Sequence, residues 1–210
     1  MSLQVLVRRL GTPRQALIEN VALKVAPGTV HTVMGPSGCG KSSLLAAICG
    51  TLSDDFDFDG DIQLNGHDVG QRPTEQRQIG ILFQEDLLFA HMTVFENLLF
   101  AVLPGPHGVR EAQVREGLAD LEMTAFAHAN PATLSGGQRG RVALMRALLA
   151  QPKALLLDEP FAKLDADLRG RMRQFVFDLV AKRQLPTLLV THDASDIADP
   201  TRLTRLTAHA

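Results

Sequence analysis

The eight residues 35–42, Gly-Pro-Ser-Gly-Cys-Gly-Lys-Ser, constrain the fold of this 210-residue chain more than any other segment. They match the pattern G-x-x-x-x-G-K-S/T, in which glycines let successive backbone N–H groups turn towards phosphate oxygens. An apolar run expected to be a strand precedes them at 29–34, and a helical pattern follows at 41–49. The start of that helix adds the positive end of its dipole. The segment therefore predicts a phosphate-binding loop.

Two side chains of this loop have chemical tasks. We expect Lys41 to reach the β- and γ-phosphates of a nucleotide and the Ser42 hydroxyl to be a Mg²⁺ ligand. A glycine-rich turn with an exposed lysine is the alternative, and the flanking strand and helix argue against it. The other residues expected to contact the nucleotide here are Gly35, Pro36, Ser37, Gly38, Cys39, Gly40 and Ser43.

Along the rest of the chain, short apolar runs alternate with longer helical patterns, which predicts βαβ units and a mostly parallel sheet. The run 154–158 is apolar without alternation, as expected for a strand covered on both faces. A strand and turn at 21–28 predict an antiparallel group beside this core. Expected strands are 3–8, 21–25, 29–34, 61–64, 79–83, 154–158 and 187–191, and expected helices are 41–49, 94–102, 110–121, 138–149, 167–183 and 194–198.

The predicted fold class is α/β, in a single domain over 1–210. The pattern between 81 and 136 is largely helical, and we interpret it as a helical lobe at about 85–138, inserted into a core of about 1–84 and 139–210. With 45% hydrophobic and 21% charged residues, the composition is that of a globular protein. The net charge of −2 argues against nucleic acid as the primary partner.

Two carboxylates, Asp158 and Glu159, follow the apolar run 154–158. Ligands of open α/β sheets bind at the carboxyl ends of the strands. We expect Asp158 to hold Mg²⁺, directly or through a water, and Glu159 to orient and deprotonate an attacking water as a general base. A solvated pair of loop acids is the alternative, and the presence of the phosphate loop argues against it.

The five residues 134–138, Leu-Ser-Gly-Gly-Gln, predict a second phosphate-binding helix start. A serine and two glycines ahead of a helix supply a hydroxyl and free N–H groups for an anion. Because the chain's own loop forms one γ-phosphate site, a second helix start of this kind suggests the nucleotide of a partner chain. An N-cap followed by a glycine-rich turn is the alternative interpretation.

These five residues resemble the signature motif of the ATP-binding-cassette (ABC) ATPases. The resemblance covers about residues 3–199, and the landmarks of that family occur here in the same order. They are Gly35–Ser42, Gln84, the five residues Leu134, Ser135, Gly136, Gly137 and Gln138, then Leu155–Glu159, Leu164–Asp165 and His192.

The resemblance implies an ATP-hydrolysing enzyme with Mg²⁺ and a P-loop NTPase core. Gln84 is similar to the Q-loop glutamine that contacts Mg²⁺ and links the core to the helical lobe, and Asp165 is similar to the D-loop aspartate. His192 is similar to the switch histidine that contacts the γ-phosphate. The catalytic residues implied are Lys41, Glu159 and His192, and the metal-binding residues implied are Ser42, Gln84 and Asp158.

The partners that the resemblance implies begin with a second cassette. In the family's head-to-tail dimer, each ATP lies between one chain's phosphate loop and the other chain's residues 134–138. Residues 89–97 resemble the part of small-solute and ion importer ATPases that receives a coupling helix of the membrane subunit, and an exposed Phe89 and Met92 would suit that contact. We therefore expect transmembrane permease subunits, a solute-binding protein acting through the permease, and a location on the cytoplasmic face of the membrane.

Other functions stay open at this point. An export or lipid-release ATPase has the same catalytic residues. A soluble cassette ATPase of DNA repair or translation also resembles the chain, although such proteins usually carry a long coiled coil or two cassettes. The full catalytic set argues against a non-enzymatic scaffold, and a nucleotide kinase has no use for residues 134–138.

Two positions depart from the family pattern. Its members usually place an aromatic residue near the first strand to stack on adenine, and Leu10 is expected at that place in a chain that has no Tyr or Trp. A serine is more usual at Ala162 or Lys163, shortly before Asp165. The first departure predicts that phosphate and metal contacts carry most of the affinity for the nucleotide.

Overall fold

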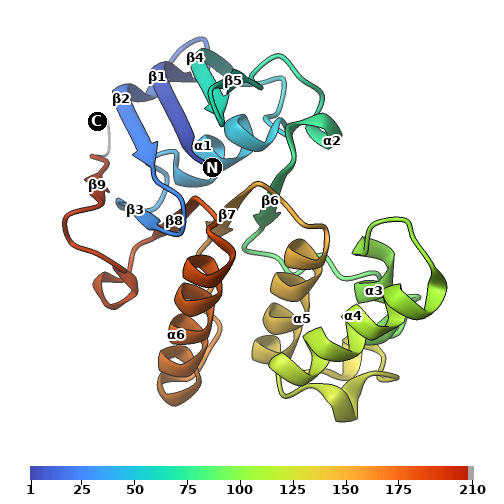
Figure 1. Ribbon diagram of the computed structural model, residues 1–210. Helices are drawn as coiled ribbons and strands as arrows, with labels where there is room; N and C mark the ends of the chain where they lie inside the picture. The colour runs from blue at the N-terminus through green and yellow to red at the C-terminus, as the bar shows by residue number, and fades with distance from the viewer. Residues whose placement is uncertain (208–210) are drawn as a thin grey trace.

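Two sheets enclose one helix in the computed structural model, which describes residues 1–207, and a group of helices extends from the larger sheet (Figure 1). The larger sheet is parallel throughout, with strand order β6-β7-β8-β3-β9. Strands β7 and β8 are buried along their whole length, which explains why their sequences are apolar without alternation. The strands are β3 (Val30–Met34), β6 (Ile79–Leu82), β7 (Ala154–Asp158), β8 (Thr187–Thr191) and β9 (Leu203–Arg205).

The smaller sheet is antiparallel, with strand order β2-β1-β4-β5. Helix α1 (Lys41–Cys49) packs between the two sheets, against β1 on one side and β6 and β7 on the other. Its Leu44 and Ile48 join one hydrophobic core with Leu3 of β1 and Leu156 of β7. The strands of this sheet are β1 (Leu3–Gly11), β2 (Ala16–Val25), β4 (Asp57–Leu64) and β5 (His67–Asp68).

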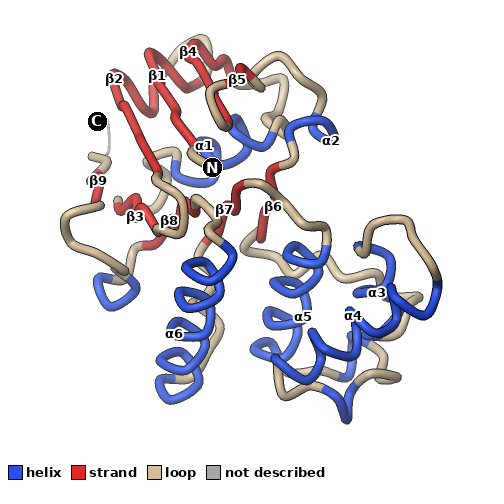
Figure 2. The backbone as a smooth tube through the Cα atoms, viewed as in Figure 1, coloured by secondary structure: helices blue, strands red, loops and turns tan. Residues whose placement is uncertain are grey.

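A second hydrophobic core lies among the remaining helices, which are joined by loops (Figure 2). Helix α5 packs against both β6 and α3, so it connects these helices to the parallel sheet. None of the helices described within 1–207 combines the length and the apolar character that a membrane span requires. The helices are α2 (Thr74–Arg77), α3 (Val94–Ala101), α4 (His107–Asp120), α5 (Gly136–Leu149) and α6 (Ala166–Arg183), with short 3₁₀ turns η1 (Thr124–Phe126), η2 (Pro131–Thr133) and η3 (Ala194–Asp196).

Helix α1 ends against the buried guanidinium group of Arg77. The Nη1 of Arg77 donates hydrogen bonds of 2.8 and 2.9 Å to the carbonyl oxygens of Ala47 and Ile48. The Nη2 of Arg77 donates one of 2.7 Å to the carbonyl oxygen of Gly70. The last carbonyls of a helix have no partner within the helix. Arg77 therefore satisfies two of them and ties the helix that follows the phosphate loop to the chain segment before β6.

The expected strands are all present, and α1 has the predicted bounds. Strand β4 begins four residues earlier than expected, at Asp57. The start was not predicted because aspartate is depleted in strands. Here the aspartates lie on the exposed face of the strand. There Asp59 and Asp61 pair with Arg8 of β1. The expected helix 194–198 is only the turn η3. The short elements α2, β5 and β9 were not predicted, because they are too short to show a period in the sequence.

Candidate functional site

A cavity of about 600 Å³ lies at the amino-terminal end of α1. The phosphate loop meets there with residues that follow three strands of the parallel sheet: Gln84 after β6, Glu159 after β7 and His192 after β8. Parallel strands bring their carboxyl ends to one edge of a sheet, where ligands bind. The lining residues are Leu17, Ser37, Gly38, Gly40, Lys41, Ser42, Ser43, Phe56, Gln84, Glu159 and His192.

Glycine is required at two positions of the phosphate loop. Gly40 has a φ of +91°, in the left-handed region, and a Cβ there would lie 3.0 Å from the Cβ of Leu17. At Gly35, a Cβ would lie 2.5 Å from the Sγ of Cys39. The backbone can therefore take this path, and approach a ligand closely, only without side chains at these positions.

The loop folds around the ammonium group of Lys41, whose side chain is buried in the protein. Its Nζ donates hydrogen bonds of 2.8 Å to the carbonyl oxygens of Gly35 and Pro36. These two residues and Cys39, which is buried, are not among the lining residues, although all three were predicted to contact the nucleotide. The cavity is instead bounded by the other predicted loop residues.

Asp158 ends β7 and is only 6% exposed. Burial raises the pKa of the Asp158 carboxyl, and the adjacent charge of Glu159 raises it further, whereas contact with the Ser42 hydroxyl and the charge of Lys41 lower it. Asp158, Ser42 and Gln84 supply carboxylate, hydroxyl and amide oxygens, which are the donor atoms that Mg²⁺ prefers. The residues present therefore fit a magnesium ion.

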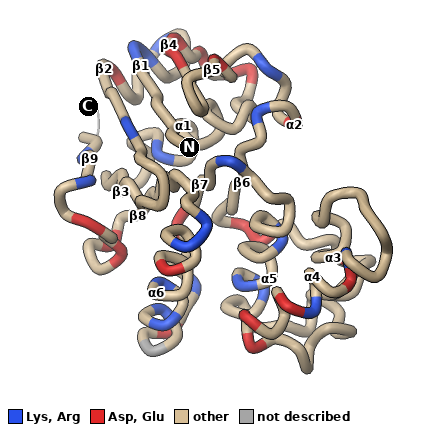
Figure 3. Tube along the Cα trace, in the orientation of Figure 1, with Lys and Arg blue, Asp and Glu red and all other residues tan. Residues whose placement is uncertain are grey.

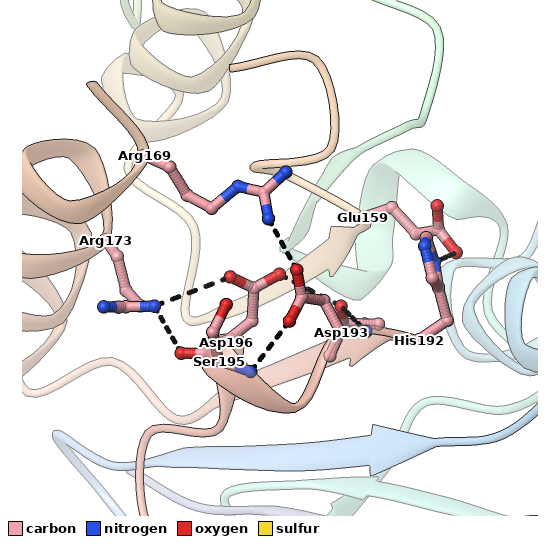
Figure 4. A network of polar contacts seen from close by, with 8 residues as sticks. Glu159, Arg169, Arg173, His192, Asp193, Ser195 and Asp196 are labelled. Atoms are coloured by element: carbon pink, nitrogen blue, oxygen red, sulfur yellow. Dashed lines mark hydrogen bonds and ion pairs between the residues drawn. The ribbon is translucent and has the colours of Figure 1, made fainter. Parts of the chain in front are cut away.

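Glu159 and His192 meet at the edge of the cavity (Figure 4). The Nδ1 of His192 lies 2.8 Å from the Oε1 of Glu159, while the backbone N–H of Glu159 donates a 3.0 Å hydrogen bond to the carbonyl oxygen of Val190. Glu159 has a φ of 46°, in the left-handed region that non-glycine residues seldom occupy. Such backbone strain is typical of functional sites.

Polar contacts from α6 also hold the segment that follows His192 (Figure 4). Basic residues are spaced along α6 (Figure 3), and the Nη1 of Arg169 lies 2.5 Å from the Oδ2 of Asp193. One turn further along α6, Arg173 donates to the carbonyl oxygen of Ser195. The buried Asp196 accepts from the Thr191 hydroxyl at 3.0 Å. No pattern in the sequence relates α6 to the end of β8, so this network could not be predicted from it.

None of residues 134–138 is among the lining residues of this cavity, although Gly136 lines a smaller neighbouring pocket with Gln84 and Glu159. Ser135 caps α5: its Oγ accepts a 3.2 Å hydrogen bond from the N–H of Gln138, whose Oε1 accepts one of 2.8 Å from the N–H of Ser135. Leu134 is buried in the core of the helices. Asp165 likewise caps α6 outside the cavity, accepting from the N–H of Leu168 at 2.9 Å. A single chain thus keeps the two predicted phosphate-binding segments separate.

The unusual Lys163 has a partner in the structure. Its Nζ lies 3.7 Å from the Oδ2 of Asp86, which also lies 3.2 Å from the Nε of Arg139. The Asp86 side chain is only 13% exposed. Lys163 therefore connects the loop before α6 with the residues after Gln84 and with the first turns of α5.

Two expectations about side chains are wrong. Leu10, expected beside adenine, is fully buried in the core between the sheets, because its position in β1 faces inward. Phe89 and Met92, expected to be an exposed pair, are half-buried. The Phe89 ring packs edge-on against Phe100 at a centroid distance of 5.0 Å, and Phe100 is the exposed member of that pair.

Comparisons with known proteins agree with this geometry. Residues 18–162 match the family described as ABC transporter. The chain is 49% identical to the uncharacterized ABC transporter ATP-binding protein YnjD of Escherichia coli, over 90% of this chain and 87% of that protein. It is 40% identical to the sulfate/thiosulfate import ATP-binding protein CysA of Pseudomonas aeruginosa over 87% of this chain, and it spans only 57% of that relative.

Solved structures resemble the fold over the whole chain. The dimeric structure of MJ0796, a bacterial ABC transporter cassette, has a TM-score of 0.83 and 26% identity, over 98% of this chain and 94% of that one. A post-hydrolysis state of the same cassette, bound to ADP and Pi, has a TM-score of 0.82 and 25% identity, over 100% and 97% of the two chains.

The fold and the site define an ATP-hydrolysing nucleotide-binding cassette, with a parallel P-loop core, an antiparallel sheet and a group of helices. The chain belongs to the ABC transporter family, as an ATP-binding subunit.

The buried Asp158 gives a prediction about stability. Its pKa is higher in the folded chain than in the unfolded chain, where it is about 3.9. The folded chain therefore binds the proton more tightly, and stability falls as the pH rises through the window above 3.9. Asp158→Asn removes the free-energy cost of ionising the buried carboxyl. We therefore expect the free energy of unfolding to rise by about 1 kcal/mol at pH 7 and by less at pH 4.

Urea unfolding at the two pH values measures this difference. Asp178→Asn is the matched control, because Asp178 is exposed on α6, where its side chain accepts a hydrogen bond from Gln174 one turn away. We expect the control to change stability little at either pH. A gain for Asp158→Asn that is larger at pH 4 than at pH 7 would contradict the prediction.

Proposed function

We propose that this chain is the ATP-hydrolysing subunit of a membrane importer for a small solute or ion, working as a head-to-tail dimer. The observation that carries the proposal is the single cavity in which Lys41 and Ser42 meet Gln84, Glu159 and His192. Of the relatives, those named as sulfate/thiosulfate import proteins support the direction of transport.

The phosphate loop binds the triphosphate in this proposal. Backbone N–H groups of residues 37–43 and the amino-terminal end of α1 face the phosphates, and Lys41 turns its ammonium from loop carbonyls to the β- and γ-phosphates. Ser42, Gln84 and Asp158 would hold Mg²⁺. When bound, Mg²⁺ would neutralise the charge that develops on the phosphates during transfer.

Glu159 is the general base that orients and deprotonates the attacking water. Its carboxylate lies beside His192, which positions the γ-phosphate and that water. Arg169 and Asp193 act as positioning residues, because their contact holds the segment that carries His192. Glu159 lines the cavity with its backbone in the left-handed region.

The second phosphate-binding segment, residues 134–138, serves the partner's ATP. In one chain none of these residues lines the cavity, so we assign the segment to the nucleotide of a second copy in the opposite orientation. The capping arrangement at Ser135 uses the hydroxyl oxygen as an acceptor and leaves its proton free to donate to a phosphate. The dimeric structures of the related cassette support this arrangement.

An apolar groove of about 370 Å³ is the proposed docking place for the permease. It lies between the segment after β6 and helices α3 and α5, with Leu87 and Phe100 exposed at its rim. Arg146 and Phe89 also line the groove, and the Arg146 guanidinium lies over the Phe89 ring at 5.2 Å from its centroid. Through this contact the chain would reside on the cytoplasmic face of the membrane.

Glu159→Gln tests the catalytic assignment. The substitution keeps size and hydrogen bonding but removes basicity, so we expect hydrolysis to fall by about 10² to 10⁴-fold while ATP binding is kept. The ATP-bound dimer should accumulate, as measured by size-exclusion chromatography. Glu116→Gln, on the exposed side of α4, is the control. Turnover by Glu159→Gln within threefold of the wild type would refute the role of Glu159.

Ser135→Arg tests the composite site. We expect this variant to bind nucleotide as a monomer but to fail to dimerise with it, because the larger cation occupies the position meant for the partner's phosphate. A Lys41→Ala chain should lack hydrolysis for a different reason, because its own phosphate loop has lost the lysine. Mixing the two variants creates one intact site per mixed dimer, so hydrolysis should appear that neither shows alone. Wild-type hydrolysis by Ser135→Arg alone is incompatible with the dimer proposed here.

Phe100→Glu tests the docking place. A carboxylate on the rim of an apolar groove must lose its hydration when a partner helix binds, which is costly. We expect the wild-type chain to co-purify with its membrane subunit and the variant to lose that subunit. Val109→Glu, which is also exposed but lies outside the groove on α4, is the control. Equal recovery of the membrane subunit with both variants would place the permease elsewhere.

A further inference from the structure

Two residues of the cavity have no task in the hydrolysis proposed above. Leu17 of β2 and Phe56, just ahead of β4, are apolar, yet they line a cavity that otherwise consists of loop backbone and polar side chains. Phe56 is half-buried, and the sequence pattern did not single it out.

Phe56 lies beside the end of β1, close to the position of Leu10 at which an adenine contact was expected. Asp57, the next residue, pairs with Gly11 at the end of β1. The N–H of Phe56 donates a 3.0 Å hydrogen bond to the carbonyl oxygen of Ser53, which closes the turn that leads into β4. The position of Phe56 is thus set by backbone contacts on both sides, whereas Leu10 is turned into the core.

The cavity takes its lining from both sheets. Gln84, Glu159 and His192 follow strands of the parallel sheet. Leu17 of β2 and Phe56 ahead of β4 lie at one end of the antiparallel sheet, where Ala16 and Asp57 both pair with Gly11. The phosphate loop lies between these two groups of lining residues, and Leu17 is close enough to touch a Cβ placed on Gly40. A nucleotide whose γ-phosphate is at the polar end therefore extends its base towards the apolar end.

We propose that Phe56 is the aromatic surface on which the base of the bound nucleotide stacks, with Leu17 as its apolar neighbour. Among the described residues, Phe56 is the one phenylalanine that lines this cavity. A ring supports any base through its π-face and reads no hydrogen-bonding edge. The platform therefore adds affinity for ATP and GTP alike. This inference rests on the placement of the triphosphate in the proposed function.

The first experiment compares ligands with and without a base. Phe56→Leu keeps an apolar side chain but removes the ring. We expect it to weaken ATP and GTP binding by about tenfold in equilibrium titrations, which corresponds to about 1.4 kcal/mol. Binding of inorganic tripolyphosphate should stay within twofold of the wild type. Phe126→Leu, a matched change at a partly exposed ring of η1, should alter neither.

The second experiment uses the absence of tryptophan from the chain. Phe56→Trp adds a single fluorophore at the proposed platform and keeps an aromatic ring there. We expect ATP to quench its emission through stacking and tripolyphosphate to leave the emission nearly unchanged. This signal reports contact with the base and does not depend on turnover.

The outcomes separate this inference from the proposed function. If Phe56→Leu binds ATP within twofold of the wild type, or loses tripolyphosphate and ATP equally, Phe56 is not the base platform. Equal quenching of Phe56→Trp by both ligands would overturn it as well. Loss of tripolyphosphate binding in Lys41→Ala would still support the phosphate site, whereas a wild-type chain that binds neither ligand would refute the proposed function itself.

Discussion

The parallel pairing of β7 with β8 is the interaction on which the arrangement of the site depends. Its register places Asp158 opposite Val190, so that the backbone of Glu159 continues the ladder for one more hydrogen bond and then leaves it. His192 leaves β8 two residues beyond Val190. The carboxylate and the imidazole, 33 residues apart in the chain, meet for this reason at 2.8 Å. Strand β3 pairs with the other side of β8, and the phosphate loop begins where it ends.

Charged contacts connect these loops to the helices. Asp86 joins the segment after β6 to α5 through Arg139 and to the loop before α6 through Lys163. Arg169 on α6 holds the segment after β8 through Asp193. The arginine and lysine members of these pairs are partly exposed, so each contact contributes at most about 1 kcal/mol. The contacts nevertheless link α5 to Asp86 and to the loop that carries Lys163.

The site is maintained at a cost in stability. Asp158 carries a carboxyl that burial makes harder to ionise, and Glu159 has a backbone conformation that most residues avoid. Both features place oxygen atoms at the carboxyl end of β7, beside Ser42 and the cavity. The buried core between the two sheets, which contains α1, supplies the stability that offsets these costs.

Elements with local signals could be predicted from the sequence alone: the phosphate loop, the bounds of α1, the buried run of β7 and the order of the family's motifs. Which side chains reach the cavity depends on the tertiary structure. Alternation along β1 shows that residues face two ways, but only the packing of this sheet against α1 shows that Leu10 faces the core. Only the pairing of β1 with β4 brings Phe56 to the cavity. The ion-pair partner of Lys163 and the contacts of Arg169 and Arg173 near His192 could not be predicted either. Contacts between distant segments depend on how strands pair and helices pack, and a local sequence period does not indicate this.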